Sequence, residues 1–254
     1  MQREVVAVIV DCNTLFGFWP RRKLKSDLDS VKAEAASHGI TKSCICSIRG
    51  IFADHTDGND ETLKVCKSDP SLEPVATLNP HRWLDLNSEI DMRLAQGVRM
   101  FRFFPEYQHW PYRFMPFYRI LSMLEGSGVM VVCPARVGGH QNNGVMTQIA
   151  ALAGEYDLKF LITGVYYGNL AEAIAVAQSE ERIFLETHLV NSPDGFEVLV
   201  KEVGAERLIY GSQSPLHHVN TSLFPLLHAA INDEDKEKIL HANISRELGW
   251  TECK

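Results

Sequence analysis

The sequence predicts an α/β protein in which residues 1–254 form one (β/α)8 TIM barrel. Three observations predict it. The length of 254 residues is ordinary for this architecture, eight short apolar runs follow one another, and amphipathic stretches separate them. Such runs are typical of strands that are buried on both faces of a parallel sheet. A doubly wound open sheet is the structural alternative, because periodicity does not show whether the sheet closes.

The apolar runs give the expected strands in chain order: residues 5–10, 43–48, 74–78, 98–104, 129–133, 159–163, 182–187 and 207–210. Helical spacing predicts helices at 87–97, 114–126, 169–178 and 233–248. Ser26 is expected to cap a helix that reaches Gly39, and Ser192 to cap one that ends at Gly204. No linker rich in Pro, Gly or Ser divides the chain, so we expect a single domain.

Composition restricts the class of protein. The net charge is −7 and no long run of Lys or Arg occurs, which argues against a nucleic-acid partner. No apolar stretch approaches the roughly 20 residues that span a bilayer, so no membrane partner is expected. The first apolar run is too short for a secretory signal. The six cysteines show no paired framework, which predicts reduced thiols and a cytoplasmic protein.

In a barrel of this kind, the functional site forms at the C-terminal ends of the strands. Polar residues interrupt or follow the apolar runs at these ends: Asp11, Asn13, Arg102, Glu186, His188 and Gln213. Their positions predict a polar pocket there.

Five segments along the chain have a recognisable pattern: VIVDCNTLFG at 8–17, GVRMFR at 97–102, LKFLITG at 158–164, GAERLIYGSQSP at 204–215 and KILHAN at 238–243. In this order they resemble segments of the metal-dependent amidohydrolase superfamily, and the resemblance covers nearly the whole chain. It implies the barrel fold and a hydrolase-type activity. Fold alone does not establish function, however.

The resemblance also implies one or two divalent ions that activate water. Histidines on the first, fifth and sixth strands and an aspartate on the eighth would hold them. The corresponding positions of this sequence have Asn13, Leu15, Cys133 or Pro134, Gly164 and Gln213. Leu and Gly offer no donor atom and neutral amides are weak partners for zinc, so we expect no metal and no other cofactor at that site.

Two groups of polar side chains are the candidates for chemistry. Arg102 presents a planar fork suited to a carboxylate or phosphate, and the alternative is a salt bridge to Asp11 or Glu186. Glu186 and His188 are two residues apart, share a face and could act as an acid/base pair. The alternative for His188 is a loop histidine bonded to the backbone. We assign catalysis to Asp11 and His188, and substrate binding to these four: Asn13, Arg102, Glu186 and Gln213.

Other reactive residues have simpler interpretations. His140, His188 and His217 could assemble a rebuilt metal site, but their spacing matches no ligand signature, which favours surface histidines. Cys12 and Cys133 could be nucleophiles. Because Cys12 alternates with Asp11 and Asn13, it is expected to point outward and pack against a helix.

The segment after the fourth strand is rich in aromatic residues: Phe103, Phe104, Tyr107, Trp110, Tyr112, Phe114, Phe117 and Tyr118. It could wall a ligand pocket, form a subunit contact or pack in the core. The sequence therefore predicts a hydrolase or lyase that acts on a small polar or carboxylated metabolite without a metal. The alternative is a non-catalytic protein that binds a ligand or a partner. A homodimer is expected from the habit of the family and from the aromatic segment.

Overall fold

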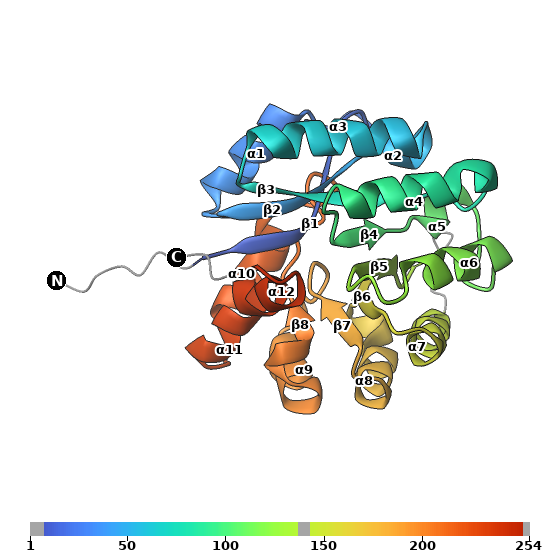
Figure 1. Ribbon diagram of the computed structural model, residues 1–254. Coiled ribbons are helices and arrows are strands. Elements are labelled where there is room, and N and C mark those ends of the chain that lie inside the picture. Colours follow the sequence, from blue (N-terminus) through green and yellow to red (C-terminus); the bar gives the residue numbers. More distant parts are fainter. Residues whose placement is uncertain (1–7, 137–142, 251–254) are drawn as a thin grey trace.

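The computed structural model describes residues 8–136 and 143–250. Eight strands form one parallel sheet in which each strand pairs with the next along the chain (Figure 1). The strands are β1 (Val10–Phe16), β2 (Lys42–Ser47), β3 (Leu72–Thr77), β4 (Met100–Arg102), β5 (Met130–Pro134), β6 (Lys159–Thr163), β7 (Ile183–Glu186) and β8 (Leu208–Ile209).

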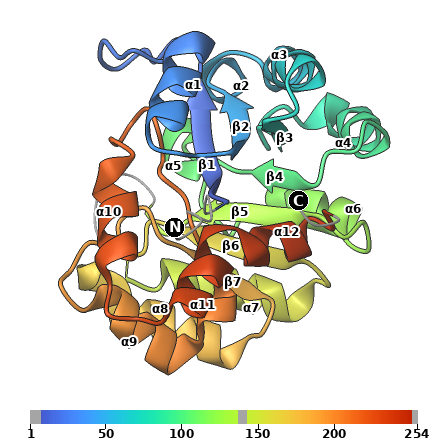
Figure 2. The same ribbon diagram turned by 90° about the vertical axis from the view of Figure 1, so that its left-hand side faces the viewer.

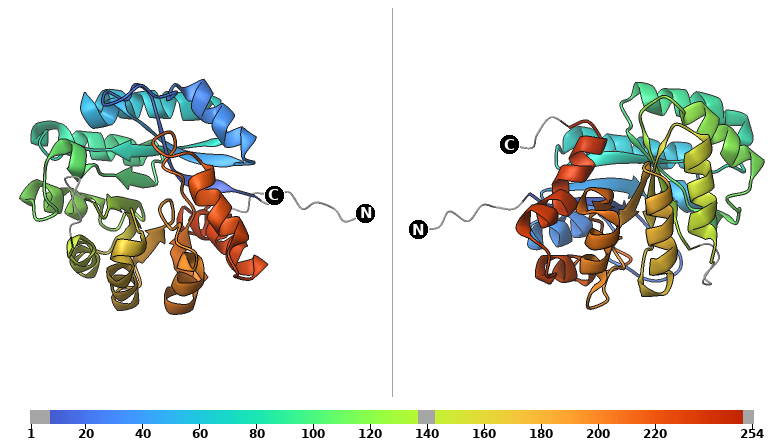
Figure 3. Two further views of the ribbon diagram at one scale, coloured as in Figure 1. Left: turned by 180° about the vertical axis from the view of Figure 1, so that it is seen from behind. Right: turned by 90° about the horizontal axis from the view of Figure 1, so that it is seen from below.

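The first and last strands come together and close the ring (Figure 3). The Cys12 amide donates to the Tyr210 carbonyl at 3.1 Å, and the Leu15 amide donates to the Ser214 carbonyl at 2.8 Å. Closure excludes the doubly wound open sheet and confirms the (β/α)8 barrel.

Helices surround the strands, with α1 to α4 on one side of the molecule and α7 to α11 on the other (Figures 1 and 2). Those that follow the first four strands are α1 (Leu28–Ser37), α2 (Arg49–Phe52), α3 (His55–Ser68), α4 (Leu86–Ala95), α5 (Pro105–Gln108) and α6 (Met115–Leu124). The remainder are α7 (Val145–Glu155), α8 (Leu170–Ser179), α9 (Gly195–Val203), α10 (Asn220–His228), α11 (Asp233–Glu237) and α12 (Asn243–Glu247). None of the helices described here is long and apolar enough to cross a membrane.

The core has two layers, because side chains of each strand alternate between the barrel interior and the surrounding helices. The interior cluster includes Val10, Cys12, Val75, Met100, Val132, Leu161, Phe184 and Ile209. The larger outer cluster packs strand residues such as Phe101, Phe160 and Leu185 against the helices. Cys12 therefore faces inward, and the expectation that it points toward a helix is wrong. The register of β1 against β2 shifts between Asp11 and Thr14, which breaks the simple alternation.

Local boundaries differ from the sequence expectations in four places. The first strand was expected at 5–10, of which 5–7 lie outside the described residues; it begins at Val10 and continues to Phe16, since hydrogen bonds from the end of β8 allow Asp11 to lie within a strand. The cap of α1 is Asp27, whose carboxylate accepts from the Ser30 amide at 2.9 Å, and not Ser26. Asp194 occupies the N-cap position of α9 in place of Ser192. The predicted helix at 233–248 is interrupted by a π-helical segment, Lys238–Ala242, between α11 and α12.

Candidate functional site

A cavity of about 510 Å³ opens at the C-terminal ends of the strands. Residues that follow β5 to β8 form one side of it, and segments that follow β1 and β4 form the other. The lining includes Trp19, Arg21, Arg22, Glu106, Tyr107, Arg136, Thr163, Gly164, His188, Gln213 and His217. Of the predicted site residues, His188 and Gln213 line this cavity.

His188 and Glu186 form a tight buried pair. The His188 amide donates to Glu186 Oε1 at 2.9 Å, and His188 Nδ1 bonds to Glu186 Oε2. A carboxylate on Nδ1 fixes the orientation of an imidazole and leaves Nε2 for another partner. Since His188 lines the cavity, the pair can present an acid/base group there.

Gly211 provides the space for this pair. A Cβ atom at Gly211 would lie 2.3 Å from Glu186 Oε1 and 2.8 Å from the Asn13 Cβ. No real Cβ packs so closely, so any larger residue at this position would displace the carboxylate or the strand. Glycine at the end of β8 therefore lets Glu186 and Asn13 share the top of the barrel interior.

Asp11 serves the closure of the barrel. Its Oδ1 accepts from the Ser212 amide at 2.9 Å and from the Asn13 amide at 3.0 Å, and its Oδ2 accepts from the Ser212 hydroxyl. Burial raises the pKa of Asp11, and the hydrogen bonds from Ser212 and Asn13 oppose that rise. Asp11 is not part of the cavity lining, so the structure places it as a link between β1 and the end of β8.

Asn13 and Arg102 are buried near the C-terminal ends of β1 and β4 and are not part of the cavity lining. Within the described residues, neither side-chain amide atom of Asn13 has a hydrogen-bond partner. Arg102 is 5% exposed and its guanidinium lies 4.8 Å from the Phe104 ring centroid. Neither Asp11 nor Glu186 forms an ion pair with Arg102, so the salt-bridge alternative for this residue is wrong. Leaving a buried guanidinium unpaired is costly, which suits a residue that receives an anion.

Three further arginines surround the cavity. Arg21 lies over the Tyr107 ring at 4.8 Å, Arg22 donates to the Leu216 carbonyl at 2.6 Å, and Arg136 lies 5.9 Å from the Tyr166 ring centroid. Across residues 8–136 and 143–250, none of the three forms an ion pair with a carboxylate. The mouth of the barrel is therefore basic although the protein as a whole carries a charge of −7.

Among the described residues, Glu106 is the one acidic side chain that lines the cavity. It lies in the first turn of α5, and its Oε2 is shielded from solvent without a hydrogen-bond partner in the described part of the chain. Burial raises the pKa of Glu106 to about 7, while Arg102 and Arg21 oppose the shift. A carboxyl group that titrates near neutral pH can both give and take a proton. Sequence reasoning missed it, although it follows the fourth strand directly.

The structure describes one of the other two predicted histidines, His217. His217 lines the cavity, and its ring centroid lies 5.4 Å from that of His188, so it is not a surface histidine. Burial lowers the pKa of His217, and the neighbouring His188 adds to that effect. His140 lies outside the described residues. Burial raises the pKa of both the Cys12 and Cys133 thiols well above the usual range, so neither is an activated nucleophile.

Some residues of the aromatic segment pack in the core, and Tyr107 lines the cavity. Phe103, Trp110 and Phe117 pack together with ring centroids 4.9–6.1 Å apart in the outer core. Tyr107 instead lines the cavity beside Trp19, at a centroid distance of 5.3 Å. Trp19 was not predicted, because a single tryptophan after β1 has no pattern that distinguishes it from core.

Comparison with known proteins identifies the family. The model of the family described as Amidohydrolase matches residues 59–250. No curated protein matches the sequence.

Among solved structures, 5-carboxyvanillate decarboxylase from Sphingomonas paucimobilis is 14% identical with a TM-score of 0.74, over 96% of this chain and 100% of that chain. The 2,6-dihydroxybenzoate decarboxylase from Rhizobium is 12% identical with a TM-score of 0.76, over 95% and 98%. A dihydroxybenzoic acid decarboxylase from a Polaromonas species, with bound manganese and 2-nitroresorcinol, is 13% identical with a TM-score of 0.76, over 95% and 97%. At these identities the likeness concerns the fold. The closed barrel and the match over residues 59–250 together show that this chain belongs to the amidohydrolase family.

Proposed function

We propose that the barrel mouth binds a small aromatic carboxylate and catalyses a hydrolase- or lyase-type reaction on it. The observation that carries this proposal is a set of arginines without carboxylate partners in the described chain. Arg21, Arg22 and Arg136 line the cavity, and Arg102 is buried at the C-terminal end of β4. A guanidinium binds a carboxylate through two parallel hydrogen bonds, and Trp19 and Tyr107 supply faces for an aromatic ring. The decarboxylases with the same fold act on molecules of this class by their names.

Acid/base chemistry would come from two groups on opposite walls. His188, oriented by Glu186, presents Nε2 to take a proton from the substrate or from water. Glu106, with a pKa of about 7, is protonated in a large fraction of molecules at neutral pH and can deliver a proton to a leaving group or a carbanion. In a decarboxylation the bond between ring carbon and carboxyl carbon breaks, carbon dioxide leaves, and the ring carbon receives that proton.

The family's usual metal centre does not suit the residues at this site, and we propose that the reaction proceeds without it. Leu15 is fully buried in the interior cluster and has no donor atom. At Gly164 the side-chain stem of Arg136 lies 3.7 Å from where a Cβ would be, so this strand end also offers no donor side chain. Asn13 and Gln213 have neutral amides. The same replacements favour a second function, in which the protein binds the carboxylate and performs no chemistry.

The test is a titration of tag-free protein with 2,6-dihydroxybenzoate, followed by the fluorescence of Trp19 against the background of a Trp19→Phe variant. We expect saturable binding, at least ten-fold weaker binding of resorcinol, which lacks the carboxylate, and at least ten-fold weaker binding to Arg102→Met. Arg182→Gln, which removes an exposed arginine paired with Glu180, should bind as the native protein does. Equal binding of the two ligands would contradict the carboxylate site.

A measurement of turnover distinguishes the catalytic function from the non-catalytic one. Release of carbon dioxide from 2,6-dihydroxybenzoate, or consumption of another aromatic carboxylate that binds, should be lost in His188→Gln and Glu106→Gln while binding persists. Tight binding without turnover of any bound carboxylate would support the non-catalytic function instead.

A further inference from the structure

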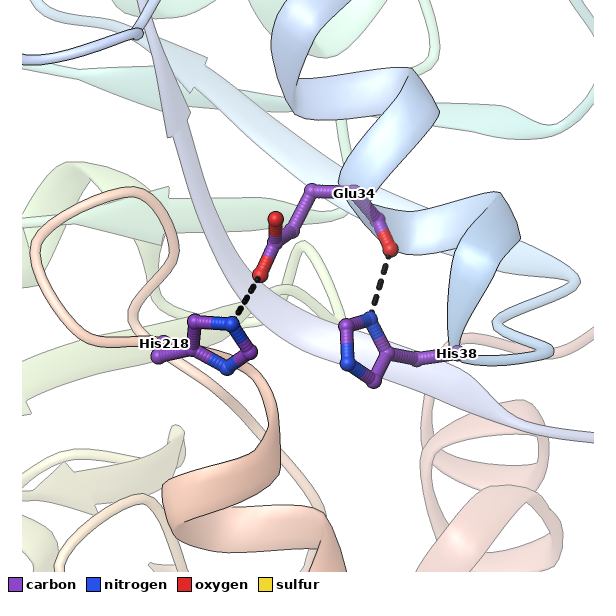
Figure 4. Close-up of side chains that lie close together, drawn as sticks. All are labelled: Glu34, His38 and His218. Atoms are coloured by element: carbon purple, nitrogen blue, oxygen red, sulfur yellow. Dashed lines mark hydrogen bonds and ion pairs between the residues drawn. The ribbon is translucent and has the colours of Figure 1, made fainter.

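A second group of potential ligands lies outside the barrel, away from the cavity described above. Glu34 and His38 are on α1, four residues apart, and His218 lies in the segment between β8 and α10 (Figure 4). One donor atom from each residue lies within 4.8 Å of the others. We propose that these three side chains bind a zinc ion.

The distances fit tetrahedral zinc. His218 Nε2 is 3.4 Å from Glu34 Oε1. Two donors at 2.0–2.2 Å from a tetrahedral zinc ion are about 3.3 Å apart, so this pair already has the separation that the ion requires. The His38 ring meets the His218 ring edge to face, with centroids 5.3 Å apart. Two imidazoles and one carboxylate form a ligand set that zinc uses when a fourth position stays open.

The orientation of His38 is a second, independent observation. Its Nδ1 bonds to the Glu34 carbonyl at 2.8 Å, and a carbonyl can only accept. The proton of the neutral ring is therefore on Nδ1, and Nε2 keeps its lone pair. Histidine ligands of metals make this hydrogen bond, which fixes both the tautomer and the ring plane. The helix backbone itself thus prepares His38 as a ligand.

His218 needs one adjustment. Its Nδ1 accepts from the Asn220 amide at 3.2 Å, so the ring proton is on Nε2 and faces Glu34. Zinc at Nε2 would move that proton to Nδ1, and the Asn220 amide would bond to water, since Asn220 is exposed. The cost is small because the bond is long and lies at the surface.

The surroundings leave room for the fourth position. A hollow of about 490 Å³ adjoins the group and is lined by residues of α1 and of the segment after β8, among them Ser30, Glu34, Ser37, Ser214, His217 and His218. A water molecule can reach the ion from this hollow. His217 lines both this hollow and the cavity of the barrel mouth. Zinc at this position would fix the segment that carries Gln213 and His217 against α1, across the seam between β1 and β8.

The proposal can be tested by isothermal titration calorimetry, in which zinc chloride is added to the full chain prepared without an affinity tag. We expect one equivalent to bind with a micromolar Kd and the Tm to rise. Each of His38→Gln, His218→Gln and Glu34→Gln should weaken binding at least ten-fold. His228→Gln is the matched control, because His228 is an exposed histidine whose Nδ1 bonds to the Phe224 carbonyl at 2.9 Å, as His38 bonds to Glu34, but it has no part in the group.

Cobalt provides a second readout that does not depend on affinity. Co²⁺ in a tetrahedral or five-coordinate site of nitrogen and oxygen donors gives intense visible bands, whereas hydrated Co²⁺ gives weak ones, and we expect these bands in the native protein and in His228→Gln only. No binding of zinc at 100-fold excess would overturn the proposal. So would full binding by His38→Gln and His218→Gln, or loss of binding in His188→Gln with His38→Gln unaffected, which would place the ion in the barrel mouth.

Discussion

Two buried arginines of this protein have opposite surroundings. Arg93, on α4, is fully buried and donates to Glu89 at 2.7 and 3.2 Å, to Asp60 at 2.6 Å, to Gln96 at 3.0 Å and to the Thr56 carbonyl at 3.2 Å. Arg102, at the end of β4, is 5% exposed, lies over the face of Phe104 and forms no ion pair with Asp11 or Glu186.

The two arginines differ in whether the surrounding protein supplies partners for their charge. The network around Arg93 continues to Asn59, whose side chain bonds to Glu89 at 2.7 Å and to both backbone groups of Thr77 at 2.9 Å, so the buried charges of Arg93 and Glu89 both have partners. At the barrel mouth, by contrast, the Asn13 side-chain amide and Glu106 Oε2 have no hydrogen-bond partner in the described chain, and the guanidinium of Arg102 lies over the Phe104 ring. Buried charges are therefore paired between α3 and α4, whereas at the barrel mouth buried polar groups are left without protein partners in the described part of the chain.

The largest effect should come from breaking the satisfied network. Arg93→Met leaves Glu89 buried without its cation, and we expect the free energy of unfolding to fall by about 3–5 kcal/mol. Urea denaturation measures the change. Arg182→Met, at an ion pair on the surface, is the control and should unfold at the same urea concentration as the native protein. A loss below about 1 kcal/mol in Arg93→Met would show that the network is not structural.

A pH-dependent effect of intermediate size is expected at Glu106. Because its pKa is raised from 4.5 to about 7 in the folded state, the folded protein holds this proton more tightly than the unfolded chain. The stability that results is present below pH 4.5 and is lost as the pH rises through 7. Glu106→Gln removes this loss and should be more stable than the native protein at pH 8 by an amount on the order of 2 kcal/mol, with little difference at pH 4.5.

Urea denaturation at the two pH values measures this difference, and Glu155→Gln, at an exposed site on α7, is the matched control. Identical pH dependence of the native protein and Glu106→Gln would show that the carboxylate is solvated and not suited to proton transfer at neutral pH.

The smallest change in stability is expected at Arg102. Arg102→Met removes an unpaired buried charge and keeps most of the side-chain volume, so the free energy of unfolding should change by less than about 1 kcal/mol and could rise. The same variant should lose ligand binding. A large loss of stability in Arg102→Met would place Arg102 with Arg93 among the structural charges, and the proposed carboxylate site would lose its central residue.

The fold and the general position of the site followed from the sequence. Apolar runs such as 129–133 and 159–163 are rich in β-branched residues and separated by helical patterns. Strands that are buried on both faces can therefore be predicted from composition alone. The polar residues that follow such runs include Glu186, His188 and Gln213. They were predicted to lie together because strand ends in a closed parallel sheet converge on one face. Helix caps were less certain, since several residues near α1 and α9 have side chains of the capping type.

Tertiary structure decided what each polar residue does. Asp11 and Arg102 are similar in sequence context, yet the end of β8 supplies donors to Asp11, whereas no carboxylate of the described residues pairs with Arg102. Glu106 and Trp19 reach the cavity only because short segments after β4 and β1 fold over the same opening. His218 meets Glu34 and His38 across the seam between β1 and β8, about 180 residues apart in the chain. The periodicity and composition of the sequence indicate which side chains are buried. Which partners those side chains find depends on contacts between distant segments, and only the closed barrel fixes these.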